Sequence, residues 1–182
     1  MAIRRKHIRS LVDGILVDRN ITGPQVPVGE IARSMGITVQ QENAEEKLSG
    51  FLVRHSESGE AIIGVNTNHP RPRRRFTIGH ELGHYLLHEG ELVHFDGERP
   101  GYRVNLRANT NPASDMEREA NLFAAELLMP ARFLRADERI AKLDLLDEEA
   151  TGLLKEVADE YGVSVQALTY RLANLGLIDE SQ

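Results

Sequence analysis

Three residues within one short stretch of the chain have the types and the spacing to bind and use a metal ion. His80, Glu81 and His84 form the pattern His-Glu-x-x-His. Residues four apart on an α-helix share a face within ~6 Å of each other, so both imidazoles can bind one ion at ~2.0–2.1 Å. Glu81 can then reach a water molecule on that ion without ligating it, as a general base must. The pattern indicates a metal-dependent hydrolase; the alternative is an ordinary amphipathic helix with surface histidines.

A catalytic zinc site needs three protein ligands and an open position, and the nearby histidines do not supply the third ligand. His88 would lie about 12 Å from His80 along a straight helix, too far for both to bind one ion. His94 would serve only if the chain turned back at a glycine in position 87, where the sequence has Leu87. The third ligand is therefore expected from another helix.

The segment 115–130 predicts that second helix and carries several carboxylates. At about 100° per residue its apolar side chains define an inward face, and Glu117 lies about 45° from the centre of that face. Glu119 and Glu126 lie about 115° and 135° away, so both are expected to point to solvent. Glu117 is thus the preferred third ligand. Asn121, one turn later, could hold a histidine or Glu117 in its orientation.

Small residues on both predicted helices suggest that the two helices pack closely. Gly79 and Gly83 lie four apart on the metal-binding helix, although glycine costs a helix interior about 1 kcal/mol each. Ala120 and Ala124 offer a matching strip on the second helix. Two such thin helices can approach closely enough to share an ion. The alternative is a core helix that carries a partly buried acid.

Composition limits both the ligands and the class of protein. The 182-residue chain has no cysteine, which excludes disulfides and thiolate ligands, so nitrogen and oxygen must hold any metal. Zinc is the default ion for such a site, although manganese or iron can occupy it. The net charge of −6 argues against a general nucleic-acid coat. Without an 18-residue apolar stretch or a signal-peptide pattern, we expect a cytoplasmic protein with no membrane span.

The residue patterns predict an α+β fold that is mainly helical. Apolar periodicity predicts helices over 3–19, 28–35 and 115–129, a metal-binding helix from about Pro72, and two helices within 150–175. Strands are predicted at 37–39, 51–53 and 61–65. Because the last two flank a turn at 56–59, they predict a hairpin, and together the strands predict a three-stranded antiparallel sheet before the metal-binding helix.

Residues 89–113 lack periodicity and predict a long loop, with one short strand near 102–106. Long loops in compact domains are often functional, so Tyr102, Arg103 and His94 are candidates for substrate binding or oxyanion stabilisation. A strand of the predicted hairpin, foremost the one over 60–66, is the candidate for holding an extended substrate by strand addition.

Four arginines, Arg71 and Arg73 to Arg75, cluster at the start of the metal-binding helix. Cations oppose the helix dipole at this end, so some other interaction should favour them. One interpretation is a surface for an acidic substrate or partner. The other is a solvated face whose arginines pair with nearby acids.

The segment 157–172 resembles a helix-turn-helix, which raises a second hypothesis, a DNA-binding or repressor-binding regulator. A module that reads a DNA groove normally presents a basic face. Residues 153–178, however, hold only Lys155 and Arg171 against three acids. We therefore expect this segment to pack on the rest of the chain, with docking of a partner protein as an alternative, and we expect no direct nucleic-acid binding.

The stretches Arg-Phe-Thr-Ile-Gly-His-Glu-Leu-Gly-His-Tyr-Leu-Leu-His (75–88) and Glu-Arg-Glu-Ala-Asn-Leu-Phe-Ala-Ala-Glu-Leu-Leu-Met-Pro (117–130) together resemble the ImmA/IrrE family of bacterial and phage metallo-endopeptidases. By this resemblance His80 and His84 match the zinc-binding histidines, Glu81 the catalytic glutamate and Glu117 the third ligand. The order of sheet and helix resembles a minimal zincin fold. We accordingly expect an N-terminal helix (1–26), a metallopeptidase domain (27–140) and a C-terminal helical segment packed on it (141–182).

Members of this family typically cleave a helix-turn-helix repressor and so relieve repression of stress, phage or mobile-element genes. The resemblance implies that substrate class for this chain. It also implies a mechanism in which zinc activates water and polarises the scissile carbonyl, while Glu81 moves the proton to the leaving amine. A metal-binding protein that acts on its repressor without proteolysis stays open as a further alternative.

Overall fold

The computed structural model describes residues 3–55, 58–88, 93–97, 114–143 and 150–178. The described helices are α1 (Arg5–Asp18), α2 (Val28–Ser34), α3 (Arg71–Leu87), α4 (Asp115–Leu128), α5 (Ala131–Ala136), α6 (Glu138–Ala141), α7 (Ala150–Tyr161) and α8 (Val165–Asn174). The described strands are β1 (Ile37–Glu42), β2 (Leu48–Arg54), β3 (Ala61–Asn66) and β4 (Val93–Gly97). The predicted α+β class with a majority of helix is confirmed. Among the described residues, no helix combines the length and the apolar character needed to cross a membrane.

The sheet is mixed, and β4 adds a strand that the sequence did not predict. Its described strands follow the order β1-β3-β2-β4. β2 pairs antiparallel with β3 and with β4, but β1 pairs parallel with β3. The prediction of a three-stranded antiparallel sheet was therefore wrong in its strand number and in one pairing. Alternation along a strand indicates which side chains share a face, but it carries no information on the direction of the neighbouring strand.

The loop from β1 to β2 crosses the end of β3, and Asn66 holds it there. The Asn66 Nδ2 donates to the carbonyl oxygens of Ala44, Glu45 and Leu48 at 3.2, 2.9 and 2.8 Å. Asn66 is buried, and a buried amide requires such partners. This crossing lets β3 lie between β1 and β2. Because β2 and β3 form an antiparallel hairpin, β3 then runs parallel to β1.

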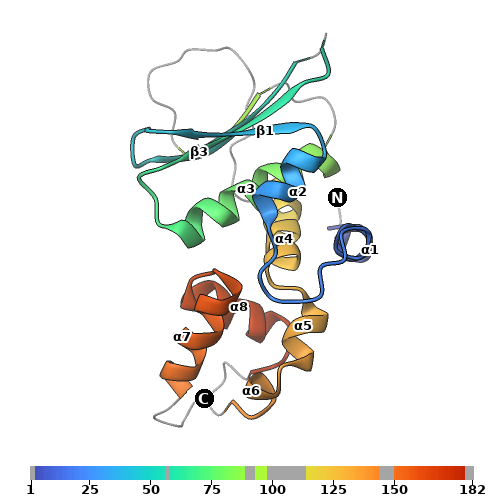
Figure 1. The fold of residues 1–182 in the computed structure, drawn as a ribbon, viewed down its shortest axis with the longest axis vertical. Coiled ribbons are helices and arrows are strands. Elements are labelled where there is room, and N and C mark those ends of the chain that lie inside the picture. Colours follow the sequence, from blue (N-terminus) through green and yellow to red (C-terminus); the bar gives the residue numbers. More distant parts are fainter. Residues whose placement is uncertain (1–2, 56–57, 89–92, 98–113, 144–149, 179–182) are drawn as a thin grey trace.

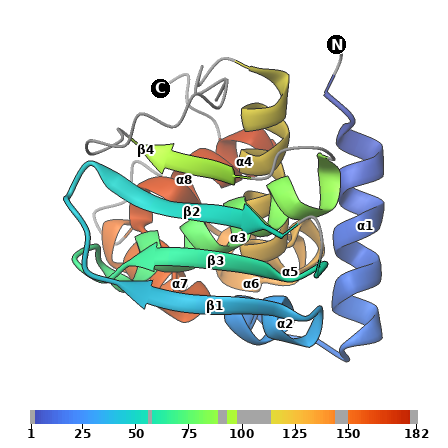
Figure 2. The same cartoon turned by 90° about the horizontal axis from the view of Figure 1, so that it is seen from above.

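The helix α3 lies between the sheet and α4 (Figure 1). The C-terminal helices α7 and α8 lie at the far end of the molecule from the sheet, and α1 stands along one side in both views (Figures 1 and 2). Leu82 of α3 and Phe123 and Leu127 of α4 are fully buried between these layers. Because α3 is covered on two sides, every residue from Gly79 to His84 is buried. The metal-binding pattern therefore lies in the interior, not on the surface of an amphipathic helix.

The helices α3 and α4 approach each other backbone to backbone at Gly83. A Cβ atom on Gly83 would lie 3.1 Å from the Cα of Ala120 and 3.2 Å from its carbonyl oxygen. A Cβ atom on Gly79 would lie 3.3 Å from the Cβ of Ala124. The predicted pairing of glycines with alanines is therefore found, and it brings α4 within reach of the histidines on α3.

The helices α7 and α8 and their turn lie where the helix-turn-helix resemblance predicted them. Gly162 in the turn has φ +64°, a left-handed conformation that glycine adopts readily. Ser164 caps α8 through its side-chain oxygen. Arg171 of α8 is only 4 % exposed and donates to Glu126 of α4. The pair is thus docked on α4, whereas the domain boundaries near residues 26 and 140 stay a prediction.

Replacement of Gly83 by alanine should destabilise the protein, although alanine is the better helix former, because the new methyl group would meet the backbone of Ala120. We expect a loss of about 1–3 kcal/mol in the free energy of unfolding. Gly14, inside α1, is the matched control, since nothing lies within 4 Å of its Cβ position. Gly14→Ala should therefore stabilise the protein by about 0.5–1 kcal/mol. Urea unfolding measures both changes, and a gain of stability in Gly83→Ala would contradict the close approach.

Candidate metal centre

The helix α3 carries two histidines whose ring nitrogens face each other. Pro72 lies in its first turn, where a missing N–H is tolerated, and the helix has 17 residues in total without a break. His80 and His84 lie one turn apart, and each is 2 % exposed. Their Nε2 atoms are 3.1 Å apart. Both rings thus direct a nitrogen toward one point beside the helix.

Glu117 brings its carboxylate to the same point from the first turn of α4. Ser114 caps this helix and accepts the backbone N–H of Glu117 at 3.2 Å, as the Ser-x-x-Glu spacing favours. The Glu117 Oε1 lies 3.3 Å from His84 Nε2, and its Oε2 lies 3.4 Å from His80 Nε2. The ligand atoms of the three residues all lie within 4.8 Å of one another, so the group could hold one metal ion.

The separations of these donor atoms fit a small divalent metal ion. Ligands arranged tetrahedrally at 2.0–2.1 Å from zinc stand about 3.3 Å from one another. The observed separations of 3.1, 3.3 and 3.4 Å fall around that value. Two imidazoles and one carboxylate are also the donor set of known catalytic zinc sites that keep a position open for water. The same nitrogen and oxygen donors suit manganese or iron.

Asn121 sets the orientation of His80. The Asn121 Oδ1 lies 3.0 Å from the His80 Nδ1. Since an amide oxygen only accepts hydrogen bonds, Nδ1 carries the proton and donates it, and Nε2 keeps its lone pair toward His84 and Glu117. Such a partner on the far ring nitrogen holds the tautomer of a metal-binding histidine. Asn121 therefore contacts a histidine of the group, as its place on the predicted helix suggested.

Glu81 is fully buried and follows His80 directly on α3. Its side chain leaves the helix about 100° around the axis from that of His80, and Glu81 is not part of the group of three. A carboxylate beside a metal site can exchange protons with water there without binding the ion. The role of Glu81 as general base stays a prediction.

Glu119 and Glu126 are buried, so the expectation that both point to solvent was wrong. Glu119 is 5 % exposed and Glu126 is 3 % exposed. The expected inward face was defined by the apolar residues of α4 alone, whereas α1 and α8 pack on the flanks that were assigned to solvent. Arg4, next to α1, pairs with Glu119. Arg171 of α8, together with Arg9 of α1, pairs with Glu126.

These arginines keep both acids charged. Hydrogen bonds from Arg4 hold the pKa of the Glu119 carboxyl below its usual range, against the opposing effect of burial. Burial is the largest influence on Glu126 and raises its pKa. Hydrogen bonds and charges of Arg171 and Arg9 together outweigh it, so the pKa is lowered. Both carboxylates are therefore structural partners of arginines and do not belong to the metal group.

The substrate-binding candidates of the long loop are not brought to the metal group by any described contact. Tyr102 and Arg103 lie outside the described residues. The backbone of His94 belongs to β4, opposite Leu52, where a loop had been predicted. The strand proposed to hold a substrate, β3, has β1 on one side and β2 on the other. It cannot accept a further strand, so that prediction was wrong.

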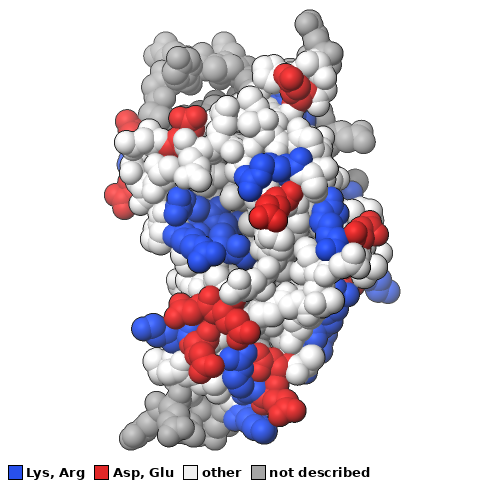
Figure 3. Space-filling model, viewed as in Figure 1, with Lys and Arg blue, Asp and Glu red and all other residues white. Residues whose placement is uncertain are grey.

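The arginine cluster at the start of α3 joins parts of the chain. Basic side chains gather over the first turns of α3, next to acidic side chains over α7 (Figure 3). Arg75 donates to the carbonyl oxygens of Gly162 at 3.1 Å and Val26 at 2.9 Å, and Arg73 donates to Ser49 Oγ at 2.9 Å. Burial, and to a smaller degree Arg71, lowers the pKa of Arg75. For Arg73 and Arg75 the described partners are thus carbonyl and hydroxyl oxygens, which neither interpretation of the cluster predicted.

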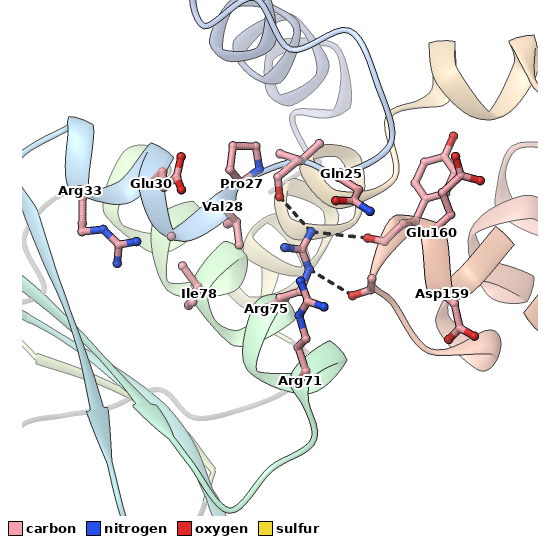
Figure 4. A pocket seen from close by; sticks show the side chains of 14 residues that line it. Gln25, Pro27, Val28, Glu30, Arg33, Arg71, Arg75, Ile78, Asp159 and Glu160 are labelled. Carbon is pink, nitrogen blue, oxygen red and sulfur yellow. Dashed lines mark hydrogen bonds between the residues drawn. The ribbon is translucent and has the colours of Figure 1, made fainter. Parts of the chain in front are cut away.

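A pocket of about 300 Å³ opens beside this cluster, between α2, the start of α3 and the turn after α7. Figure 4 shows Arg71 and Arg75 on its wall, with Glu160 on the side of α7. The residues of the metal group do not line it. It is therefore separate from the candidate metal centre.

Further residues secure the C-terminal end of α3, and the sequence analysis did not single them out for this role. Arg54, at the end of β2, donates to the carbonyl oxygens of His84 at 2.7 Å and His88 at 2.9 Å. The His88 Nε2 donates to the carbonyl oxygen of Met116, in the first turn of α4, at 3.1 Å. Carbonyl groups in the last turn of a helix lack partners within the helix, so they require such donors. The signal in the sequence is no more than an arginine that directly follows a predicted strand.

The chain is similar to one protein family and to individual relatives. The model of the IrrE N-terminal-like domain of the M78 peptidases matches residues 32–173, more than half of the chain. An uncharacterized immunity region protein of Bacillus phage phi105 is 33 % identical over 101 residues, 56 % of this chain and 57 % of that protein. The metallopeptidase ImmA of Bacillus subtilis is 25 % identical over 132 residues, 70 % of this chain and 64 % of that protein. The chain thus spans less than two thirds of either relative.

The match to the family model includes α3 and α4, and with them both histidines and the glutamate of the candidate metal centre. It also extends through most of α8, so the C-terminal helix pair falls within the matched region. The resemblance inferred from residues 75–88 and 117–130 is therefore confirmed, and the chain belongs to the IrrE N-terminal-like family of M78 peptidases.

Proposed function

We propose that this chain is a zinc-dependent endopeptidase that cleaves a helix-turn-helix transcriptional repressor. The observation that supports the peptidase most directly is the convergence of His80, His84 and Glu117 at ligand distances. Membership of a peptidase family supports the same reaction. Glu81 is buried and follows His80 directly in the sequence, and we assign it the role of the base.

A zinc ion held by these three residues would acidify a water molecule and polarise the peptide carbonyl. The chain supplies the remaining functions. Glu81 accepts the proton of the attacking water and returns it to the leaving amine. Asn121 keeps His80 in the tautomer whose Nε2 is free of hydrogen. Burial of α3 between the sheet and α4 keeps bulk water from the side chains that do this work.

The repressor substrate is proposed from the family and from the names of the relatives. The phage relative is named for an immunity region, and the Bacillus subtilis relative is named as a metallopeptidase. A peptidase that belongs to an immunity region would act by cleaving the repressor that maintains immunity. The cytoplasmic location expected from the sequence suits a substrate that is bound to DNA.

Loss of a single ligand should remove the metal from the protein. Wild type is expected to carry about one zinc per chain, and His84→Ala and Glu117→Ala should carry almost none, because two donors do not make a stable site. His7→Ala, an exposed histidine of α1, is the control and should keep its zinc. Elemental analysis after zinc loading and gel filtration measures this. A wild-type protein without metal would rule out the proposed reaction.

Glu81→Gln should retain the metal and lose proteolysis, because glutamine cannot accept the proton of the attacking water. Proteins of a cell that produces wild type or Glu81→Gln can be compared by mass spectrometry of labelled N-termini. We expect a new N-terminus in a helix-turn-helix protein with wild type alone. Glu138→Gln, at an exposed acid of α6, should behave as wild type.

Two other results would redirect the proposal. Equal cleavage by Glu81→Gln would refute the role of Glu81. A repressor that binds wild type but is not cleaved would identify a metal protein that acts by binding alone.

DNA binding by α7 and α8 is not expected. Arg171 would be the cation of the recognition helix, but it is buried and paired with Glu126. The exposed side chains of α8 include Tyr170 and Val165, which carry no charge. Fluorescence anisotropy with duplex DNA at low salt should show no binding at low micromolar protein. Binding that weakens steeply as salt rises would favour the regulator instead.

A further inference from the structure

We propose that Arg4 is a positioning residue for the metal centre, which holds the ligand-bearing helices α3 and α4 at the separation that lets Glu117 reach both histidines. The inference rests on the proposed function, since it assumes that the group of His80, His84 and Glu117 binds zinc. It concerns a residue that touches neither the ion nor the substrate.

One guanidinium nitrogen of Arg4 bridges the two helices. The Arg4 Nη2 donates to the carbonyl oxygen of Leu87 at 3.0 Å and to Glu119 Oε2 at 2.6 Å. The Arg4 Nε donates to both carboxylate oxygens of Glu119 at 3.0 and 3.1 Å. The backbone N–H of Arg4 donates to Glu119 Oε1 at 2.8 Å. Arg4 is therefore fixed on α4 by several bonds and reaches α3 from there.

Both anchor points lie close to metal ligands. Leu87 ends α3, three residues after His84, and Glu119 follows Glu117 by two residues on α4. Glu117 occupies the first turn of its helix, where backbone N–H groups have no partner within the helix and the end frays most readily. The bond from His88 to Met116 crosses between the same two helix ends. Arg4 and His88 thus join the ends that carry His84 and Glu117.

The charge of Glu119 makes this arrangement depend on Arg4. The Glu119 side chain is 6 % exposed, so its carboxylate is removed from water. Arg4 makes the close hydrogen bonds to it, and His88 Nε2 lies further away, 4.0 Å from Glu119 Oε2. Without Arg4, a buried negative charge would lie two residues from the ligand Glu117 and keep only this longer contact among the described residues. The first turn of α4 must then shift to hydrate the carboxylate, and that shift moves Glu117 away from the histidines.

Residue 4 lies outside the segment that matches the family model, which begins at residue 32. The metal centre inside the matched segment is thus secured by a side chain supplied from outside it. The N-terminal segment thus contributes a charged contact between α3 and α4 in addition to the apolar packing of α1.

Arg9 of α1 provides a matched control for Arg4, the residue that directly precedes this helix. Its Nε donates to Glu126 Oε1 at 2.9 Å, and its side chain is 48 % exposed against 45 % for Arg4. Glu126 lies nine residues after Glu117, about 13 Å further along α4. Arg171 also pairs with Glu126, so that acid keeps a partner when Arg9 is replaced. Arg9 therefore makes the same type of contact between α1 and α4, away from the metal group.

The test compares zinc affinity in the full-length variants Arg4→Met, Arg9→Met, Glu119→Gln and Arg4→Met/Glu119→Gln. Competition with a chromophoric chelator gives the zinc Kd, and circular dichroism with thermal unfolding of the metal-free proteins shows that each is folded. The visible absorption of bound Co²⁺ reports the geometry of the ligands independently of any activity.

We expect Arg4→Met to change the Co²⁺ spectrum and to raise the zinc Kd about tenfold or more, a loss of the size that follows when the orientation of a metal ligand is disturbed. Glu119→Gln should also weaken zinc binding. The double variant should lose no more zinc affinity than the single variant that binds zinc less tightly, because both changes act through one contact. Arg9→Met should stay within about twofold of wild type.

Equal zinc affinities of Arg4→Met and Arg9→Met would overturn the inference, whether both are unchanged or both are reduced. Additive losses in the double variant would also overturn it, since they would show that Arg4 and Glu119 act separately. Each of these results leaves zinc bound to wild type. A wild-type protein that binds no zinc would instead refute the proposed function, so the two failures are distinguishable.

Discussion

The structure depends on one contact, the backbone approach of α3 to α4 at Gly83 and Ala120. Two of the candidate ligands stand on α3 and the third on α4, so the distance between these helices sets the distance between the donors. A side chain larger than hydrogen at position 83 would push the helices apart at that point. This approach has a cost, because glycine has a low helix propensity and makes the isolated helix less stable than alanine would.

Charged side chains then secure what the small residues permit. Glu119 and Glu126 of α4 are buried, and the arginines described as their partners come from the N-terminal and the C-terminal parts of the chain. A buried carboxylate is stable only with such partners. The two ends of the chain are thereby bound to the helix that carries Glu117, and they meet at Glu126, which Arg9 and Arg171 share.

The site could be predicted from the sequence because its information is local. The spacing of His80, Glu81 and His84 fixes a helical face, and the apolar pattern of α4 selects Glu117 over its neighbours. The solvent exposure predicted for Glu119 and Glu126 in the same way was wrong, because the sequence of α4 carries no information on which elements pack on its flanks. Nor does it single out Arg4, which is far from Glu119 in sequence and belongs to no motif.

The fold was predictable to the same extent and for the same reason. Helix positions follow from periodicity and from caps such as Ser114 and Ser164. The order and direction of the strands do not, because they depend on where a loop crosses, and that crossing is held by the buried side chain of Asn66. β4 lay in a segment without periodicity and became a strand by pairing with β2.

The arginines that dock the C-terminal helix pair also determine how the protein unfolds. Arg75 reaches the turn after α7 from the helix that bears both histidines, and Arg171 reaches Glu126 from α8. Detachment of the pair would break the bond from Arg75 to Gly162 and the bonds from Arg171 to Glu126, so charged groups on both sides would lose partners, which costs more than the exposed surface alone. The pair and the metal helix therefore belong to one cooperative unit. The chain, although it can be divided into segments by sequence, should melt in a single transition.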